Sequence, residues 1–196
     1  MVVDMERNND SILYRLLRPI VKCFVKIFYR PKMLGLENIP KEGRIILAGN
    51  HTNIFDCLLL ISSTKRSIHF LAKDELWKGM KKILFSNLGL IPVNRRQKDH
   101  NALESAYSYL REEQLIGIFP EGTIGKKGIL PFKMGAVKMA SVTNTKIVPF
   151  AITGKYKFFS NNLKIVFGKS IKIKSKDLEQ ENDNLREAII KMVGVK

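Results

Sequence analysis

Short apolar runs alternate with helix-like segments along most of this chain, and that alternation restricts its fold more than any other feature. The runs are rich in Ile, Leu and Val and have the length of buried strands. They occupy Arg44–Gly49, Ile68–Ala72, Leu88–Val93, Leu115–Phe119 and Ile147–Ile152. Helical patterns occupy Phe55–Ser62, Asp74–Phe85, Gln97–Glu113 and Phe132–Val142, and a late strand pair near Leu163–Ile173 precedes a final helix over Asp177–Met192. Strands that alternate with helices predict an α/β sheet covered on both faces, with functional side chains at the carboxyl ends of its strands.

The size of the chain fits one such sheet. It has 196 residues, of which 45% are hydrophobic. That is enough for one buried core and too little for two ordinary domains with separate cores. We therefore expect an N-terminal helical segment over residues 1–32 and one α/β domain over residues 33–196.

The N-terminal segment has the pattern of an amphipathic helix between Ser11 and Arg30. Its basic residues recur every three or four positions, at Arg15, Arg18, Lys22, Lys26 and Arg30. Charges interrupt each apolar run well before the ~20 residues that cross a bilayer. We expect a helix that lies in the membrane interface with its cations at anionic headgroups. The alternative is a helix that packs its apolar face on the domain, and in either case Pro19 is expected to kink or split it.

The charge of the chain indicates anionic partners without choosing among them. Lys and Arg number 34 against 18 Asp and Glu, a net charge of +16. Such a field attracts nucleic acid, anionic lipid, phosphorylated substrates or an acidic carrier protein. No helix-turn-helix, zinc module or aromatic RNA-binding signature accompanies it, so we do not expect nucleic acid to be the partner.

The two cysteines indicate a reduced setting. Cys23 and Cys57 lie far apart, and no CxxC pair or Cys/His cluster has the spacing of metal ligands. Neither a disulfide framework nor a metal site is therefore predicted. No small-residue cleavage site follows an apolar run near the N-terminus, so export is not expected.

A histidine and an aspartate follow the first predicted strand. The run RIILAG leads into Asn50 and His51, and Asp56 comes five residues after the histidine. If His51 lies in the turn and Asp56 in the first turn of the next helix, the carboxylate can bond one ring nitrogen and leave the other as a proton acceptor. The helix N-terminus favours an anion at that position. This pattern predicts a general base; the alternative is a histidine held by a capping carboxylate for stability alone.

Two further motifs suit a phosphate. Phe119-Pro120-Glu121-Gly122-Thr123 follows the fourth apolar run, and a glycine-rich loop with Lys126 and Lys127 comes next. Backbone N–H groups in such a turn, together with lysines, bind anions. The run Gly89–Arg95 would place Arg95 at the carboxyl end of a strand, where its guanidinium can bind phosphate through two hydrogen bonds. The alternatives are an ordinary turn and a surface arginine.

In this order, the motifs resemble those of the lysophosphatidic acid acyltransferases, a glycerolipid acyltransferase family of bacterial membranes. The family's blocks match His51 with Asp56, Gly89–Arg95, Phe119–Thr123 and Ile147–Ala151, and the intervening stretches Ala72–Leu76 and Phe132–Ala136 also resemble it. The resemblance implies a single mixed sheet flanked by helices. It also implies a peripheral enzyme at the cytoplasmic face of the cell membrane.

The resemblance further implies a reaction. A fatty acyl chain would pass from a thioester, on acyl carrier protein or coenzyme A, to the sn-2 hydroxyl of lysophosphatidic acid, giving phosphatidic acid. His51 would be the base and Asp56 its orienting partner. The residues implied in substrate binding are Arg95, Glu121, Gly122, Thr123, Lys73, Lys126, Lys133 and Pro149, of which Pro149 would shape the site. Members often carry arginine where Ile124 stands, so Arg95 or a nearby lysine would supply the positive charge.

The chemistry needs few groups. A thiol with a pKa of about 8.5 leaves as a thiolate without a strong acid, so the difficult step is activation of the hydroxyl. No GxSxG elbow is present and neither cysteine belongs to the motifs, so direct transfer is expected, without an acyl-enzyme, metal or cofactor. Glycerol 3-phosphate or a lyso-aminolipid stays open as the acceptor, and so do the donor, the chain length and the oligomeric state.

Overall fold

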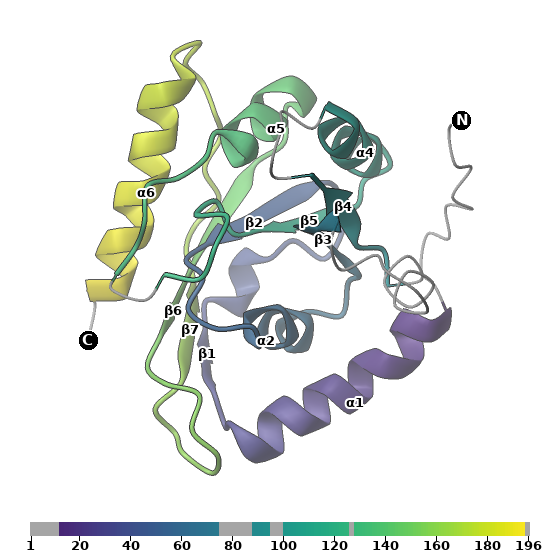
Figure 1. Ribbon diagram of the computed structural model, residues 1–196, viewed down its shortest axis with the longest axis vertical. Helices are drawn as coiled ribbons and strands as arrows, with labels where there is room; N and C mark the ends of the chain where they lie inside the picture. The colour runs from purple at the N-terminus through teal and green to yellow at the C-terminus, as the bar shows by residue number, and fades with distance from the viewer. Residues whose placement is uncertain (1–11, 75–87, 95–99, 126–127, 195–196) are drawn as a thin grey trace.

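The computed structural model describes residues 12–74, 88–94, 100–125 and 128–194 (Figure 1). Within them, seven strands form one sheet in the order β1-β7-β6-β2-β5-β3-β4. The strands are β1 (Lys32–Leu34), β2 (Ile45–Gly49), β3 (Ile68–Lys73), β4 (Ile91–Val93), β5 (Leu115–Ile118), β6 (Ile147–Thr153) and β7 (Lys164–Phe167). From β6 to β4 all neighbours are parallel, whereas β7 is antiparallel to β6 and β1 is parallel to β7. The predicted α/β fold with a single mixed sheet is confirmed.

Helices cover both faces of this sheet. On one side lie α1 (Ile12–Phe28) and α2 (Asp56–Ser63), and on the other α4 (His100–Arg111), α5 (Gly135–Thr143) and α6 (Leu178–Gly194). A short 3₁₀ helix, η1 (Leu36–Asn38), links β1 to β2. Successive residues of β2 point into opposite cores, Ile45 and Leu47 toward α1 and α2, and Ile46 and Ala48 toward the other layer. Because both faces are buried, this strand reads as a continuous apolar run.

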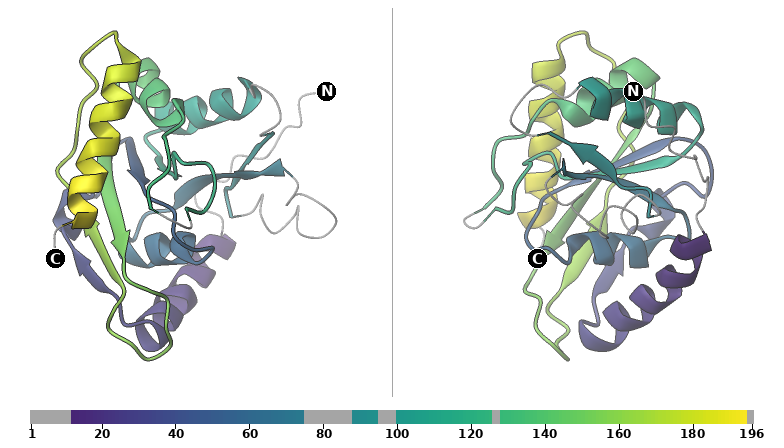
Figure 2. Two further views of the ribbon diagram at one scale, coloured as in Figure 1. Left: turned by 60° about the vertical axis from the view of Figure 1, so that its left-hand side comes forward. Right: turned by 45° about the vertical axis from the view of Figure 1, so that its right-hand side comes forward.

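Helix α1 packs against α2 and is a single helix through Pro19. Tyr14 and Val25 are buried, and the Arg18 guanidinium donates to the Thr64 carbonyl at 3.1 Å. The predicted split at Pro19 is therefore wrong, while the alternative, a kink, stays a prediction. Proline removes one hydrogen bond and strains the turn, and this packing offsets that cost. Arg18 was predicted to face anionic headgroups with the other basic residues of the helix, but its guanidinium hydrogen-bonds the domain instead. In Figure 2, α1 lies outside α2, away from the sheet.

The other side of α1 is exposed and apolar. Large side chains there are 50–72% exposed, namely Ile12, Leu16, Ile20 and Ile27. The helix therefore combines the two alternatives read from its sequence, with one face packed on the domain and another facing outward. No helix within the described ranges has the length and hydropathy needed to cross a bilayer. The division of the chain at residue 32 stays a prediction.

Some predicted elements differ from the observed ones. Strand β1 was not predicted, because three residues at a sheet edge carry no readable period. One strand of the predicted late pair is confirmed as β7, which ends at Phe167, and the second is wrong: in the described residues beyond it Ile171 forms only an isolated bridge, with Ile147. The N–H of Gly168 still donates to the Pro149 carbonyl at 2.8 Å, but Pro149 has no N–H to donate in return, and the register has shifted by one residue at Ile171. The predicted strand over 88–93 shortens to Ile91–Val93, and most of the helix predicted over 74–85 lies outside the described residues.

Candidate active site

His51 and Asp56 meet at the carboxyl end of β2, the central strand of the sheet. His51 lies in the loop after β2, and Asp56 is the first residue of α2. Nδ1 of His51 is 2.9 Å from Oδ2 of Asp56. The Asp56 side chain is fully buried, and 18% of the His51 side chain is exposed. An ionised carboxylate at Nδ1 requires the proton on that nitrogen and leaves Nε2 able to accept another.

The Asp56 carboxylate is held by the loop that it closes. Oδ2 accepts hydrogen bonds from the backbone N–H groups of Thr52 at 2.6 Å and Asn53 at 2.9 Å. Oδ1 accepts from the hydroxyls of Thr52 at 3.1 Å and Tyr156 at 2.6 Å. Hydrogen bonds and the N-terminus of α2 compensate for burial of the negative charge. The carboxylate is thereby fixed in one orientation toward His51.

The imidazole is held in its own right. Its ring stacks on Phe119, with centroids 4.1 Å apart and an interplanar angle of 19°. The His51 carbonyl accepts the N–H of Gly125 at 2.9 Å. Asn50, just before it, bonds both backbone groups of Ile152 in β6, at 2.7 and 2.9 Å. The base is therefore anchored to β6, to Phe119 after β5, and to the loop that follows.

Glu121 joins two loops through its carboxylate. One oxygen accepts the N–H of His51 at 2.8 Å, and the other accepts the N–H of Leu130 at 2.8 Å. The side chain is buried. Its contacts are thus with the scaffold of the base, and its implied role in substrate binding stays a prediction.

The turn after Glu121 lies beside a lysine. Gly122 has a left-handed φ of 70°, and a Cβ there would come within 2.9 Å of the Lys133 side chain. Thr123 and Lys133 are exposed. The structure thus gathers Glu121, Gly122 and Lys133 near the His51 loop, where a glycine leaves room for the lysine.

The other predicted binding residues are less close to the pair. Lys73 is exposed at the end of β3, at the side of β4. Pro149 is buried within β6 opposite Ala48, below the strand end where His51 lies. Arg95 and Lys126 lie outside the described residues, so their predicted roles stay predictions.

Sequence reasoning missed Tyr156. It is 100 residues from Asp56 in the chain, and no spacing rule joins them. The one available signal was its place just after β6, the strand next to β2. Burial, followed by the charge of Asp56, raises the pKa of Tyr156 far above its ordinary value. Its phenol is therefore a hydrogen-bond donor at any physiological pH.

Cys57 follows Asp56 directly, and its environment suppresses its reactivity. Burial, followed by the charge of Asp56, raises the pKa of Cys57 from 9.0 to about 12. A thiol rather than a thiolate therefore lies beside the pair at neutral pH. In the described part of the chain, no group of three or more His, Cys, Asp or Glu residues is placed to hold a metal ion.

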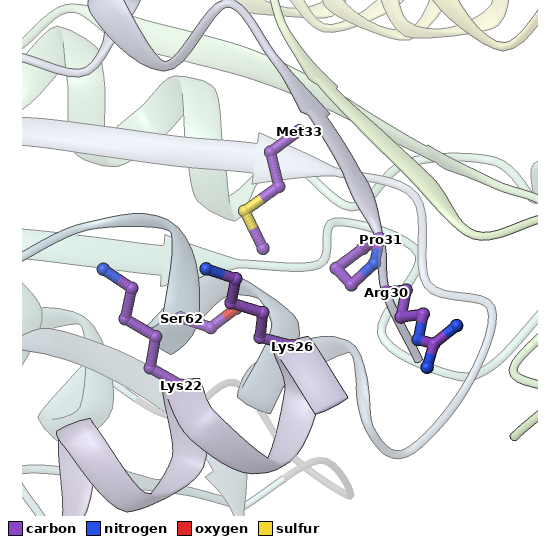
Figure 3. Close-up of a pocket in the computed structure, with 6 residues that line it drawn as sticks. All are labelled: Lys22, Lys26, Arg30, Pro31, Met33 and Ser62. Atoms are coloured by element: carbon purple, nitrogen blue, oxygen red, sulfur yellow. The ribbon is translucent and has the colours of Figure 1, made fainter. Parts of the chain in front are cut away.

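A groove of about 590 Å³ lies beside α1, away from His51 (Figure 3). Three cations border it, Lys22 and Lys26 from α1 and Arg30 from the turn that follows, and the full lining is Lys22, Lys26, Arg30, Pro31, Met33 and Ser62. In Figure 3, the Lys22 and Lys26 side chains both rise from α1 toward Met33. Within the described ranges these three cations have no carboxylate partner. The groove is thus suited to an anionic group at the surface.

The sequence and fold of this chain are similar to those of known proteins. A family model described as acyltransferase matches residues 30–153. The chain belongs to the acyltransferase family. The match includes the His51–Asp56 pair, the Glu121 turn and all of β6.

Two curated relatives carry the name 1-acyl-sn-glycerol-3-phosphate acyltransferase. The protein from Borreliella burgdorferi is 36% identical over 166 residues, which cover 79% of this acyltransferase and 66% of the relative. The one from Bacillus subtilis is 27% identical over 168 residues, which cover 81% and 82%. This acyltransferase thus spans about two thirds of the first relative's length and more of the second's.

A solved structure shares the fold. The crystal structure of the 1-acyl-sn-glycerophosphate (LPA) acyltransferase PlsC from Thermotoga maritima superposes with a TM-score of 0.71 at 21% identity. The match covers 91% of this acyltransferase and 78% of that chain. At this identity, the likeness supports the fold alone.

Proposed function

We propose that this acyltransferase moves a fatty acyl chain from a thioester to the sn-2 hydroxyl of lysophosphatidic acid, giving phosphatidic acid. The observation that carries the proposal is the His51–Asp56 pair, with a buried carboxylate 2.9 Å from Nδ1 of a histidine whose side chain is 18% exposed. The names of the two relatives favour this acceptor. The donor is acyl carrier protein or acyl-coenzyme A.

In the proposed mechanism, Nε2 of His51 takes the proton of the acceptor hydroxyl as the oxygen attacks the thioester carbonyl. Asp56 holds Nδ1–H and stabilises the imidazolium that forms. The thiol leaves as a thiolate, because its pKa is about 8.5. The thiolate then takes the proton from the His51 imidazolium, which restores the neutral base. A placed base of this kind contributes about 10²–10⁴ in rate, which is roughly 3–5 kcal/mol of barrier.

Transfer is direct in this proposal. The cysteine nearest the base is Cys57, whose pKa is about 12, so it is not an activated nucleophile. The acceptor would be oriented by its phosphate, with Lys133 and the Gly122 turn on one side of the His51 loop. An anchored phosphate that fixes the hydroxyl near Nε2 lowers the barrier by several kcal/mol, as orientation does in general.

Incubation of the full chain with each donor and three acceptors tests this proposal. The acceptors are lysophosphatidic acid, glycerol 3-phosphate and a lyso-aminolipid such as lysophosphatidylethanolamine. Phosphatidic acid formed at a higher kcat/KM than either alternative product supports the assignment. Transfer to another acceptor alone would leave the acyltransferase in place and refute lysophosphatidic acid as its substrate.

We propose further that the enzyme is peripheral at the cytoplasmic face of the membrane, resting on the outer side of α1. The exposed apolar residues of that helix continue onto Phe158 and Phe159, which are 58% and 62% exposed and whose rings contact Phe28. Lys22 and Lys26 border this surface at the groove. Apolar side chains flanked by cations suit an interface rich in anionic lipid, which is the composition of the cytoplasmic leaflet.

Sedimentation with liposomes tests this orientation. The double variant Leu16→Glu/Ile20→Glu should lose binding to vesicles that contain phosphatidylglycerol while it keeps the wild-type Tm, because both side chains are exposed. The control is Lys172→Glu/Lys174→Glu, on two other exposed residues, which changes the net charge twice as much as the Leu16/Ile20 variant does. Equal loss in both variants would show that overall charge, rather than the face of α1, drives binding.

A further inference from the structure

Tyr156 occupies a place in the site that the two-residue mechanism leaves unused. It lies in the loop after β6, and its hydroxyl donates to Oδ1 of Asp56 at 2.6 Å. The other carboxylate oxygen, Oδ2, faces Nδ1 of His51 at 2.9 Å. The three side chains thus form a continuous chain, from phenol through carboxylate to imidazole.

The ring of Tyr156 is fixed independently of this hydrogen bond. It packs edge-on against Tyr29, with centroids 5.3 Å apart, and lies 6.1 Å from Phe55. Tyr29 directly follows α1 and is buried, and Phe55 directly precedes α2. A donor held from two sides by aromatic packing can define the position of its acceptor.

We propose that Tyr156 is a positioning residue that acts through Asp56 on the base His51. This inference rests on the proposed function. The Tyr156 hydroxyl holds Oδ1, while the N–H groups of Thr52 and Asn53 hold Oδ2. Together they set the rotation of the carboxylate about its bond to Cβ, so Oδ2 stays directed at Nδ1–H. When His51 takes the proton of the acceptor hydroxyl, the carboxylate is already placed to stabilise the imidazolium.

A phenol that served packing alone would have the same aromatic neighbours and no functional link to Asp56. The two roles differ in one measurable respect. A positioning residue that acts only through the carboxylate has no further effect once the carboxylate is removed, whereas a packing residue has the same effect in either background.

The experiment is therefore a double-mutant cycle of Tyr156→Phe and Asp56→Asn, with steady-state or single-turnover acyl transfer as the readout. Tyr156→Phe keeps the ring and removes only the donor. We expect kcat to fall about 10- to 100-fold with the acceptor KM unchanged, as the loss of a hydrogen bond to a charged group predicts. In the Asp56→Asn background, the same change should lower kcat by less than about twofold.

Tyr14→Phe is the matched control, because Tyr14 is also a buried tyrosine with a hydrogen-bonded hydroxyl. Its hydroxyl accepts the Ile68 N–H at 3.1 Å, where α1 contacts β3. It should leave kcat and KM near the wild-type values. Equal losses from Tyr156→Phe in both backgrounds, or a kcat unchanged by it, would overturn the positioning role alone. Absence of transfer by the folded wild-type protein would overturn the proposed function, and this role with it.

Discussion

Replacing Glu121 by Gln distinguishes a scaffold role for this residue from contact with the substrate. Its two carboxylate oxygens each accept one backbone N–H at 2.8 Å, from His51 and from Leu130. A glutamine offers one carbonyl oxygen and one NH₂ group, so one of these N–H groups loses its acceptor. A lost hydrogen bond to a charged group costs about 1.5–3 kcal/mol. For a chain of this length, that cost lowers Tm by roughly 3–12 °C.

The same change should disturb catalysis without weakening acceptor binding. When the His51 N–H is released, the base can shift, and displacement of a reacting group by about 1 Å costs on the order of 100-fold in rate. We therefore expect Glu121→Gln to lower kcat, to lower Tm and to leave the acceptor KM unchanged. Thermal unfolding and steady-state acyl transfer measure all three quantities.

Glu113→Gln is the control for this prediction. Glu113 pairs with Arg44 at an exposed position, so its loss should cost less than about 1 kcal/mol. A Glu121→Gln variant with wild-type Tm and a raised acceptor KM would refute the scaffold role. It would instead support the role in substrate binding that the family resemblance implies.

Two further changes test other parts of the structure. Pro19→Ala restores the missing N–H inside α1 and removes a residue that costs about 3 kcal/mol in a helix interior. It should therefore raise Tm by several degrees, and a lower Tm would show that α1 depends on the proline. Cys57→Ser should keep kcat within about twofold of wild type, because the thiol is not ionised at neutral pH, and a large loss would favour an acyl-enzyme. The pKa of Cys57 rises from 9.0 to about 12 on folding, so ionisation of the thiol favours the unfolded chain and wild-type stability should fall as pH rises from 9 toward 12. The contribution of the thiol to this fall should be absent in Cys57→Ser. Chemical denaturation of the two proteins across this pH range measures the difference.

The sequence predicted the parts of the fold whose signal is local. Strands such as β2 and β6 are buried on both faces and therefore read as continuous apolar runs. The same locality explains His51 and Asp56, because the loop that joins them is only four residues long. Edge strand β1 has three residues, and Ile171 contributes a single bridge, so neither has a period that a sequence can display.

Long-range contacts account for what could not be predicted. Tyr156 reaches Asp56 only because β6 and β2 are neighbours in the sheet, and their adjacency is a property of the topology. The same is true of Glu121, whose partners His51 and Leu130 come from two different loops. For α1, periodicity showed apolar residues around most of the helix, and only packing separates the face on α2 from the outward face.

Acyl transfer to lysophosphatidic acid by His51→Ala tests the central claim most directly, with His100→Ala as the control at an exposed histidine. Both variants should unfold at temperatures near that of the wild type. The account predicts that His100→Ala keeps wild-type activity, while His51→Ala loses about 10²–10⁴ in kcat, the contribution of a placed base. A folded His51→Ala variant that forms phosphatidic acid at the wild-type rate would contradict it.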